Sequence, residues 1–170
     1  RCVDMANHTN GEVIFFSLSV MNPVIQEKLR KGSKVWYLED DWVVYNEKGK
    51  AERFLPVSHI PITINGAARH NIANVLGALA AAHTLGRPLS ELRSKVITFL
   101  STENQNRGRF NVLNIHGRTI VVDYAHNPAG LGALFETVDH LKSGRVITVG
   151  SAAGDRKDNT ILEMGRIFGS

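Results

Sequence analysis

Three polar side chains that could bind a ligand follow a short apolar run at residues 119–122. Asp123, His126 and Asn127 stand there in close succession, and Pro128 comes next. Open α/β proteins bind their ligands at the carboxyl ends of such strands. Asp123 only accepts hydrogen bonds at neutral pH and suits the hydroxyl groups of a sugar, whereas His126 can donate to a phosphate oxygen. The alternative is that Asp123 and Asn127 only cap a helix that Pro128 opens, and these residues alone leave both interpretations open.

A second pair of polar side chains, Asn71 and Asn74, falls in the first turns of a helix expected over residues 66–83. Side chains three residues apart are neighbours on a helix surface. Asparagine is a poor helix former, so its presence twice in these turns needs a reason. One reason is capping of the helix start. The other is that a carboxamide can pair with the N6 and N7 edge of adenine, as it does when proteins read adenine in DNA.

The elements that must position these groups alternate between strands and helices. Helices are predicted from Pro23 to about Leu29, over 66–83 and over 88–100, and polar residues 101–106 read as a linker. Strands are predicted by apolar runs at 12–17, 35–38, 42–45, 53–55, 109–115, 118–123 and 145–150.

The connections between these elements indicate an α/β fold with two parts. The three strands between residues 34 and 64 follow one another through short polar turns and predict a small antiparallel meander. A hairpin about His116 and Gly117 follows the linker. Beyond it we expect a helix to Leu141, a buried strand at 145–150 and a helix from Thr160. This order predicts a parallel, Rossmann-like sheet in the second part.

Composition narrows the class of protein further. The chain has 170 residues, 43% of them hydrophobic, and a net charge of +4 without a basic block, so we expect no nucleic-acid partner. Cys2 is the single cysteine, which excludes an internal disulfide and a cysteine-based metal site. Asp40 and Asp41 fit turn positions better than metal ligation. No apolar run approaches the roughly 20 residues that span a bilayer, and no signal peptide is visible, so we expect no membrane and a cytoplasmic location.

Three separated motifs resemble the Mur ligase superfamily in their order and spacing. They are Gly-x-x-x-His-Asn-x-x-Asn at 66–74, Gly-Arg-Phe at 108–110 and Asp-Tyr-Ala-His-Asn-Pro at 123–128. That superfamily uses ATP to form peptide-type bonds in peptidoglycan, folylpolyglutamate and cyanophycin synthesis. With Gly-Asp-Arg-Lys-Asp at 154–158, the set is most similar to the Mur-like part of cyanophycin synthetases. The resemblance spans nearly the whole chain.

The resemblance implies two partial domains and a nucleotide between them. Residues 1–103 would be the later half of the central ATP-binding domain, with its small β-meander, and residues 107–170 the start of the C-terminal Rossmann-like domain. In the family, the asparagines matching Asn71 and Asn74 approach the adenine of ATP.

The remaining site residues are assigned by the same resemblance. The aspartate matching Asp123 binds the ribose, and the histidine matching His126 lies near ribose and phosphate. The arginine matching Arg109 lies at the domain junction, reaches the phosphates and is our catalytic candidate. Lys157, with Arg156 as its rival, would lie near the carboxylate of the incoming amino acid, unless both are solvated loop charges.

The chain departs from the family in what it lacks. It contains no Gly-x-x-Gly-Lys-Thr/Ser phosphate loop and no glutamate and modified-lysine region for magnesium. We expect both in a sequence preceding residue 1, so that no metal ligand falls within this chain. ATP and magnesium are the cofactors implied, but the chain alone is expected to be an inactive fragment.

The function implied is that of an ATP-dependent amide-forming ligase of the cyanophycin-synthetase type. Such an enzyme activates a carboxylate as an acyl phosphate, which an amine then attacks. Its partners would be ATP, an amino acid and a carboxylate-bearing peptide or polymer, with a homo-oligomer left open. The alternative is a non-catalytic nucleotide-binding or interaction module that kept the fold.

Overall fold

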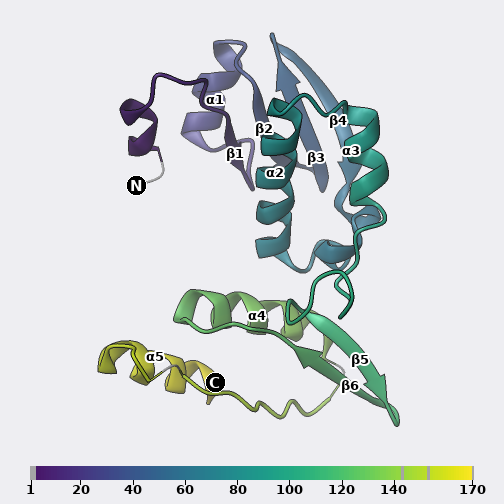
Figure 1. Ribbon diagram of the computed structural model, residues 1–170, viewed down its shortest axis with the longest axis vertical. Coiled ribbons are helices and arrows are strands. Elements are labelled where there is room, and N and C mark those ends of the chain that lie inside the picture. Colours follow the sequence, from purple (N-terminus) through teal and green to yellow (C-terminus); the bar gives the residue numbers. More distant parts are fainter. Residues whose placement is uncertain (1–2, 143, 153, 170) are drawn as a thin grey trace.

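The computed structural model describes residues 3–142, 144–152 and 154–169. Figure 1 shows two bodies joined by the linker near residue 100. The first holds a four-stranded sheet with helices α1, α2 and α3. The second holds a two-stranded hairpin with helices α4 and α5. The mixed α/β class expected from the sequence is confirmed.

The sheet of the first body has the strand order β1-β2-β3-β4. Strands β2 (Val35–Glu39), β3 (Trp42–Glu47) and β4 (Lys50–Pro56) pair antiparallel, which confirms the predicted meander. Strand β1 (Phe15–Ser17) joins the edge and runs parallel to β2. It is shorter than the strand expected over 12–17.

Helices cover both faces of this sheet because its side chains alternate between them. On one face, Val35, Tyr37 and Val44 pack against Ile25 of helix α1 (Pro23–Arg30). On the other face, α2 (Arg69–Thr84) and α3 (Leu89–Val96) cover a larger core. That core contains Trp36, Leu38, Phe54, Ile72 and Leu76. Helix α2 is therefore held rigidly against the sheet, which fixes the position of its first turns.

Helix boundaries in the first body follow their capping residues. The Asn22 side chain accepts a hydrogen bond from the Val24 backbone N–H at 3.0 Å, and Pro23 opens α1, as predicted. Gly86 follows α2 with a φ of +85°, a left-handed conformation that glycine adopts without strain. Two short 3₁₀ helices, Val57–His59 and Pro61–Thr63, bring the chain from β4 to α2.

The second body is built on the hairpin of β5 (Asn111–Ile115) and β6 (Arg118–Val122). Helix α4 (Pro128–Leu141) follows β6, and α5 (Asp158–Phe168) packs against α4, where the rings of Phe135 and Phe168 meet edge to face. The predicted hairpin and both helices are confirmed, although α5 begins two residues before the expected Thr160.

The predicted buried strand at 145–150 is wrong. This segment has no regular secondary structure, and Ile147 and Val149 are 75% and 94% exposed. An apolar run becomes a strand only when a neighbouring strand satisfies its backbone groups, and no described strand pairs with it. The expected parallel sheet is thus not present in the described part of the second body, where β5 and β6 pair only with each other.

The start of α4 offers a direct test of capping. The Asn127 side chain accepts a hydrogen bond from the Gly130 backbone N–H at 2.8 Å. Loss of such a cap typically costs about 1 kcal/mol of folding stability. We expect Asn127→Ala to lower the free energy of unfolding by that amount in a denaturant titration, and Asn127→Ser to recover most of it. Equal stabilities of the two variants would contradict the capping role.

Candidate functional site

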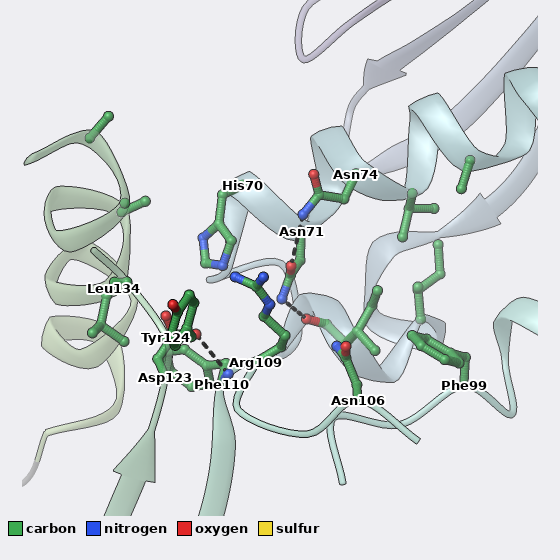
Figure 2. A pocket seen from close by; sticks show the side chains of 18 of the residues that line it. His70, Asn71, Asn74, Phe99, Asn106, Arg109, Phe110, Asp123, Tyr124 and Leu134 are labelled. Atoms are coloured by element: carbon green, nitrogen blue, oxygen red, sulfur yellow. Dashed lines mark hydrogen bonds between the residues drawn. The ribbon is translucent and has the colours of Figure 1, made fainter. Parts of the chain in front are cut away.

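A cleft of about 820 Å³ lies between the two bodies. Its walls come from the start of α2, the end of α3, the linker and the junction between β6 and α4. Figure 2 shows side chains from both bodies pointing into it. Five of the seven site residues expected from the sequence line this cleft: Asn71, Asn74, Arg109, Asp123 and His126.

Asn71 and Asn74 lie on the α2 wall but differ in what their side chains contact. Asn71 is 8% exposed and its Nδ2 donates to the Ile62 backbone carbonyl at 2.8 Å. Asn74 is exposed, and its Nδ2 donates to Oδ1 of Asn71 at 3.3 Å. Neither side chain caps the helix, because no side-chain cap is present at its start, Ala68. The capping explanation for these two asparagines is therefore wrong.

Asp123 faces the cleft from the end of β6 and holds the backbone directly before the neighbouring strand, β5. Its Oδ2 accepts a hydrogen bond from the Phe110 backbone N–H at 2.8 Å. Phe110 is buried and has a φ of +50°, a conformation that costs a bulky residue energy and needs support. The capping interpretation is thus correct for Asn127 and wrong for Asp123. Oδ1 of Asp123 makes no hydrogen bond to another described residue.

His126 follows on the same junction, with a ring orientation that restricts its chemistry. Its Nδ1 lies 3.0 Å from the Tyr124 backbone carbonyl, which can only accept, so Nδ1 must carry the proton. In the neutral ring Nε2 is then an acceptor. With a neutral ring, Nε2 of His126 therefore suits a ligand hydroxyl. It donates to a phosphate oxygen only when the ring carries a second proton.

Arg109 reaches the cleft from the chain just after the linker. Its guanidinium group lies 5.6 Å from the centre of the Tyr124 ring, a cation–π distance. The linker is fastened beside it by Asn111, which is 5% exposed. Nδ2 of Asn111 donates to the backbone carbonyls of Ser101 and Asn106 at 2.9 Å each, and Oδ1 accepts from the Gly108 N–H at 2.7 Å. Residues 101–108 are therefore bound to the second body.

Sequence reasoning gave no role to His70, although it stands in the same motif as Asn71. Its side chain points into the cleft beside Arg109 in Figure 2. Its Nδ1 is buried and has no hydrogen-bond partner among the described residues. A buried polar atom without a partner is unusual in a folded protein and suits a ligand atom. The position of His70 directly before Asn71 was the one signal in the sequence.

The titration of His70 leads to a pH prediction. Burial lowers the pKa of His70 below its usual 6.5, and the charges of Asp123 and Glu136 oppose that shift. The unfolded chain then binds the proton more readily than the folded one, so this contribution to stability is lost as pH falls below about 6.5. We expect the Tm to decrease between about pH 7 and pH 5, and His70→Phe to reduce that decrease. The exposed His8→Phe variant is the control, and equal slopes in all three proteins would refute the assignment.

Arg156 and Lys157 are not part of this site. Both are exposed, and neither lines the cleft. Arg156 lies 4.0 Å from its neighbour Asp155, and Lys157 is the residue that precedes α5. The interpretation as solvated loop charges agrees with this placement, and their contact with an amino-acid substrate remains a prediction.

Comparison with known proteins identifies the family of the chain. Residues 108–170 match the family described as "Mur ligase, glutamate ligase domain". The cyanophycin synthetase of Synechocystis sp. is 36% identical over 163 residues, which is 96% of this chain and 19% of the relative. The cyanophycin synthetase of Crocosphaera subtropica is 34% identical over the same shares. The chain belongs to the Mur ligase superfamily.

Other Mur ligases match a smaller part of the chain. The UDP-N-acetylmuramoyl-L-alanyl-D-glutamate–2,6-diaminopimelate ligase of Geobacter metallireducens is 35% identical over 115 residues, which is 67% of this chain and 22% of the relative. This Mur ligase chain thus spans about a fifth of the length of its curated relatives. The described residues include no helix able to cross a membrane and no group of three or more potential metal ligands.

Proposed function

We propose that this chain is part of an ATP-dependent ligase that forms amide bonds, and that the cleft binds the nucleotide. The observation that carries the proposal is the convergence of five expected site residues from two bodies on one cleft. Because the chain spans only about a fifth of its relatives, it would supply part of the site of a longer protein. The division into a partial central domain, 1–103, and a partial Rossmann-like C-terminal domain, 107–170, belongs to the same proposal.

The side chains that line the cleft suit the successive parts of ATP. Asn71 and Asn74 would lie near the adenine, whose donor and acceptor the exposed carboxamide of Asn74 matches. The free Oδ1 of Asp123 and Nε2 of His126 are acceptors for ribose hydroxyls. Arg109 is the cation for the phosphates.

The reaction we propose has two steps. A carboxylate oxygen of the acceptor attacks the γ-phosphorus of ATP, forming an acyl phosphate and releasing ADP. The amine of the incoming amino acid then attacks the acyl carbon, forming the amide and releasing phosphate and a proton. The demand in the first step is charge stabilisation on the transferred phosphoryl group, and Arg109 is the residue here that would meet part of it.

We name no magnesium ligand in this chain. A phosphate loop and the magnesium ligands would come from a preceding sequence. Arg156 and Lys157 are kept as candidates for the amino-acid carboxylate. We also propose a cytoplasmic location and an acceptor chemistry like that of cyanophycin synthesis.

Nucleotide binding by the chain itself tests this division of the site. We expect ATP to bind with a Kd in the millimolar range or weaker, because the amides that cradle phosphates and the metal ligands are absent from the residues described. The measurement is calorimetry, supported by chemical-shift changes at cleft residues. Micromolar binding would show that the adenine and ribose contacts suffice, which would contradict the dependence on a preceding sequence.

The alternative function is a nucleotide-binding or interaction module without catalysis. The residues encoded before Arg1 discriminate the two: a phosphate loop there supports the ligase, and its absence supports the module. The cleft would bind a nucleotide in either case.

A further inference from the structure

The hydrogen bonds at the start of α2 form a chain whose direction is fixed at one end. The Ile62 backbone carbonyl can only accept, so the Asn71 atom 2.8 Å away must be the donor Nδ2. Oδ1 of Asn71 must then point the other way, and it faces Asn74 at 3.3 Å. Because Oδ1 can only accept, Asn74 must present Nδ2 to it. The orientation of both amides thus follows from one carbonyl group.

The two asparagines are consequently not equivalent. The side chain of Asn71 is buried, and its donor and its acceptor are each already engaged within the first body. Asn74 is exposed to the cleft and keeps Oδ1 and its second N–H for a ligand (Figure 2). One free acceptor beside one free donor complements adenine, whose N6 donates and whose N7 accepts.

We propose that Asn71 is a positioning residue that fixes the amide of Asn74, and that this makes the cleft prefer 6-amino purines over 6-oxo purines. The inference rests on the proposed nucleotide-binding function. A 6-oxo purine presents an acceptor where adenine has its amino donor, so it meets Oδ1 of Asn74 unfavourably. While Asn71 holds the amide, Asn74 cannot turn its oxygen away from that contact. Specificity then has two sources. One is the favourable contact of Asn74 with adenine, and the other is an unfavourable contact with a 6-oxo group that Asn74 cannot relieve by rotating.

Removing the Oδ1 of Asn71 should weaken both effects. A free Asn74 side chain must be immobilised when it binds adenine, which weakens binding of the 6-amino purine. The same freedom lets it rotate away from a 6-oxo group, which strengthens binding of the competitor. The ratio of the affinity for the 6-amino purine to that for the 6-oxo purine therefore falls for both reasons. General destabilisation of the fold would instead lower both affinities together.

The test compares AMP with IMP, which differ at position 6, by NMR titration of the 170-residue chain. The initial slopes of the shift changes at cleft residues report relative affinity even when binding is weak. We expect the wild-type slope to be about ten-fold larger for AMP, and the ratio to fall to about two-fold in Asn71→Leu. The matched control is Asn46→Leu, since Asn46 is also buried and donates to a backbone carbonyl, that of Ser33 at 3.0 Å, outside the cleft.

A conservative variant separates positioning from stability. Asn71→Asp keeps an acceptor for Asn74 but cannot donate to Ile62, so it should destabilise the fold at least as much as Asn71→Leu while retaining the AMP preference. Should the Asn71 variants fail to fold, the ratio of slopes in the wild type and in Asn74→Ala decides. A preference that is absent in the wild type, or retained in Asn74→Ala, overturns the proposal.

The possible outcomes separate a failure of the role given to the two asparagines from a failure of the proposed nucleotide binding. Equal slopes for AMP and IMP in the wild type would overturn the selection by Asn74 and leave nucleotide binding intact. A retained preference in folded Asn71→Leu would overturn the positioning role alone. No shift change at any cleft residue with either nucleotide would refute the proposed binding function, and this inference with it.

Discussion

Replacement of Arg109 by alanine is expected to lower kcat about 100- to 1,000-fold in a longer ligase that carries this segment. The guanidinium group would face the phosphoryl group during transfer, when negative charge on its oxygens must be stabilised. An interaction made mainly in the transition state affects kcat and leaves the KM for ATP largely unchanged. The measurement is steady-state kinetics of amide formation with ATP as the varied substrate.

Two further variants make the Arg109 experiment specific. Arg109→Lys keeps the positive charge but loses the two-pronged geometry of the guanidinium group, so it should recover only part of the rate. Arg107→Ala is the matched control, because Arg107 directly follows the linker and is 82% exposed at its side chain. Among the described residues it forms an ion pair with Glu103 alone, at 3.5 Å. A loss of rate in Arg107→Ala as large as that in Arg109→Ala would argue for a general effect of charge near the linker.

Elements fixed by local patterns were predicted well. The meander, the α1 cap at Asn22 and the end of α2 at Gly86 each depend on a few adjacent residues with one physical role. The resemblance to the Mur ligases also placed Asn74, Arg109 and Asp123 together, although they lie far apart in the sequence. No local pattern could have brought them to one cleft.

Features that depend on distant partners were predicted poorly. The run at 145–150 has the composition of a buried strand, but a strand requires a neighbour that no pattern inside the run can specify. Asp123 has the position of a helix cap, yet its carboxylate accepts a hydrogen bond from the backbone of Phe110, just before the other strand. His70 became a candidate site residue only because its buried Nδ1 has no hydrogen-bond partner among the described residues, which a sequence cannot reveal.

The same dependence on distant contacts changes the description of the linker. Its polar sequence suggests a flexible connection throughout, whereas Asn111 binds residues 101–108 to the second body. The Thr98 N–H donates to the Lys95 carbonyl of α3, and the Leu100 N–H donates to the Gln105 side chain in the linker. Any relative rotation of the bodies would therefore occur near Phe99, between these two hydrogen bonds. We expect the two bodies to close on a nucleotide, because Asn74 belongs to the first and Asp123 to the second.

Closure on a nucleotide should depend on Asp123. In the longer protein, ATP contacts on both bodies should shift an open–closed equilibrium toward the closed state. Small-angle scattering should show a smaller radius of gyration with a non-hydrolysable ATP analogue than without it. Asp123→Ala should bind nucleotide about ten-fold or more weakly, since it loses hydrogen bonds between a carboxylate and the ribose, and it should close less.

Asp123 also supports the backbone of Phe110, so its alanine variant needs a control for structure. Asp123→Asn keeps an oxygen that can accept from the Phe110 N–H, and it should preserve the free energy of unfolding while still weakening nucleotide binding. Asp139→Ala, which removes a surface carboxylate on α4 that pairs with Lys142, should change neither. If the radius of gyration does not change with nucleotide and Asp123→Asn binds as well as the wild type, the role of Asp123 is confined to holding Phe110 in place.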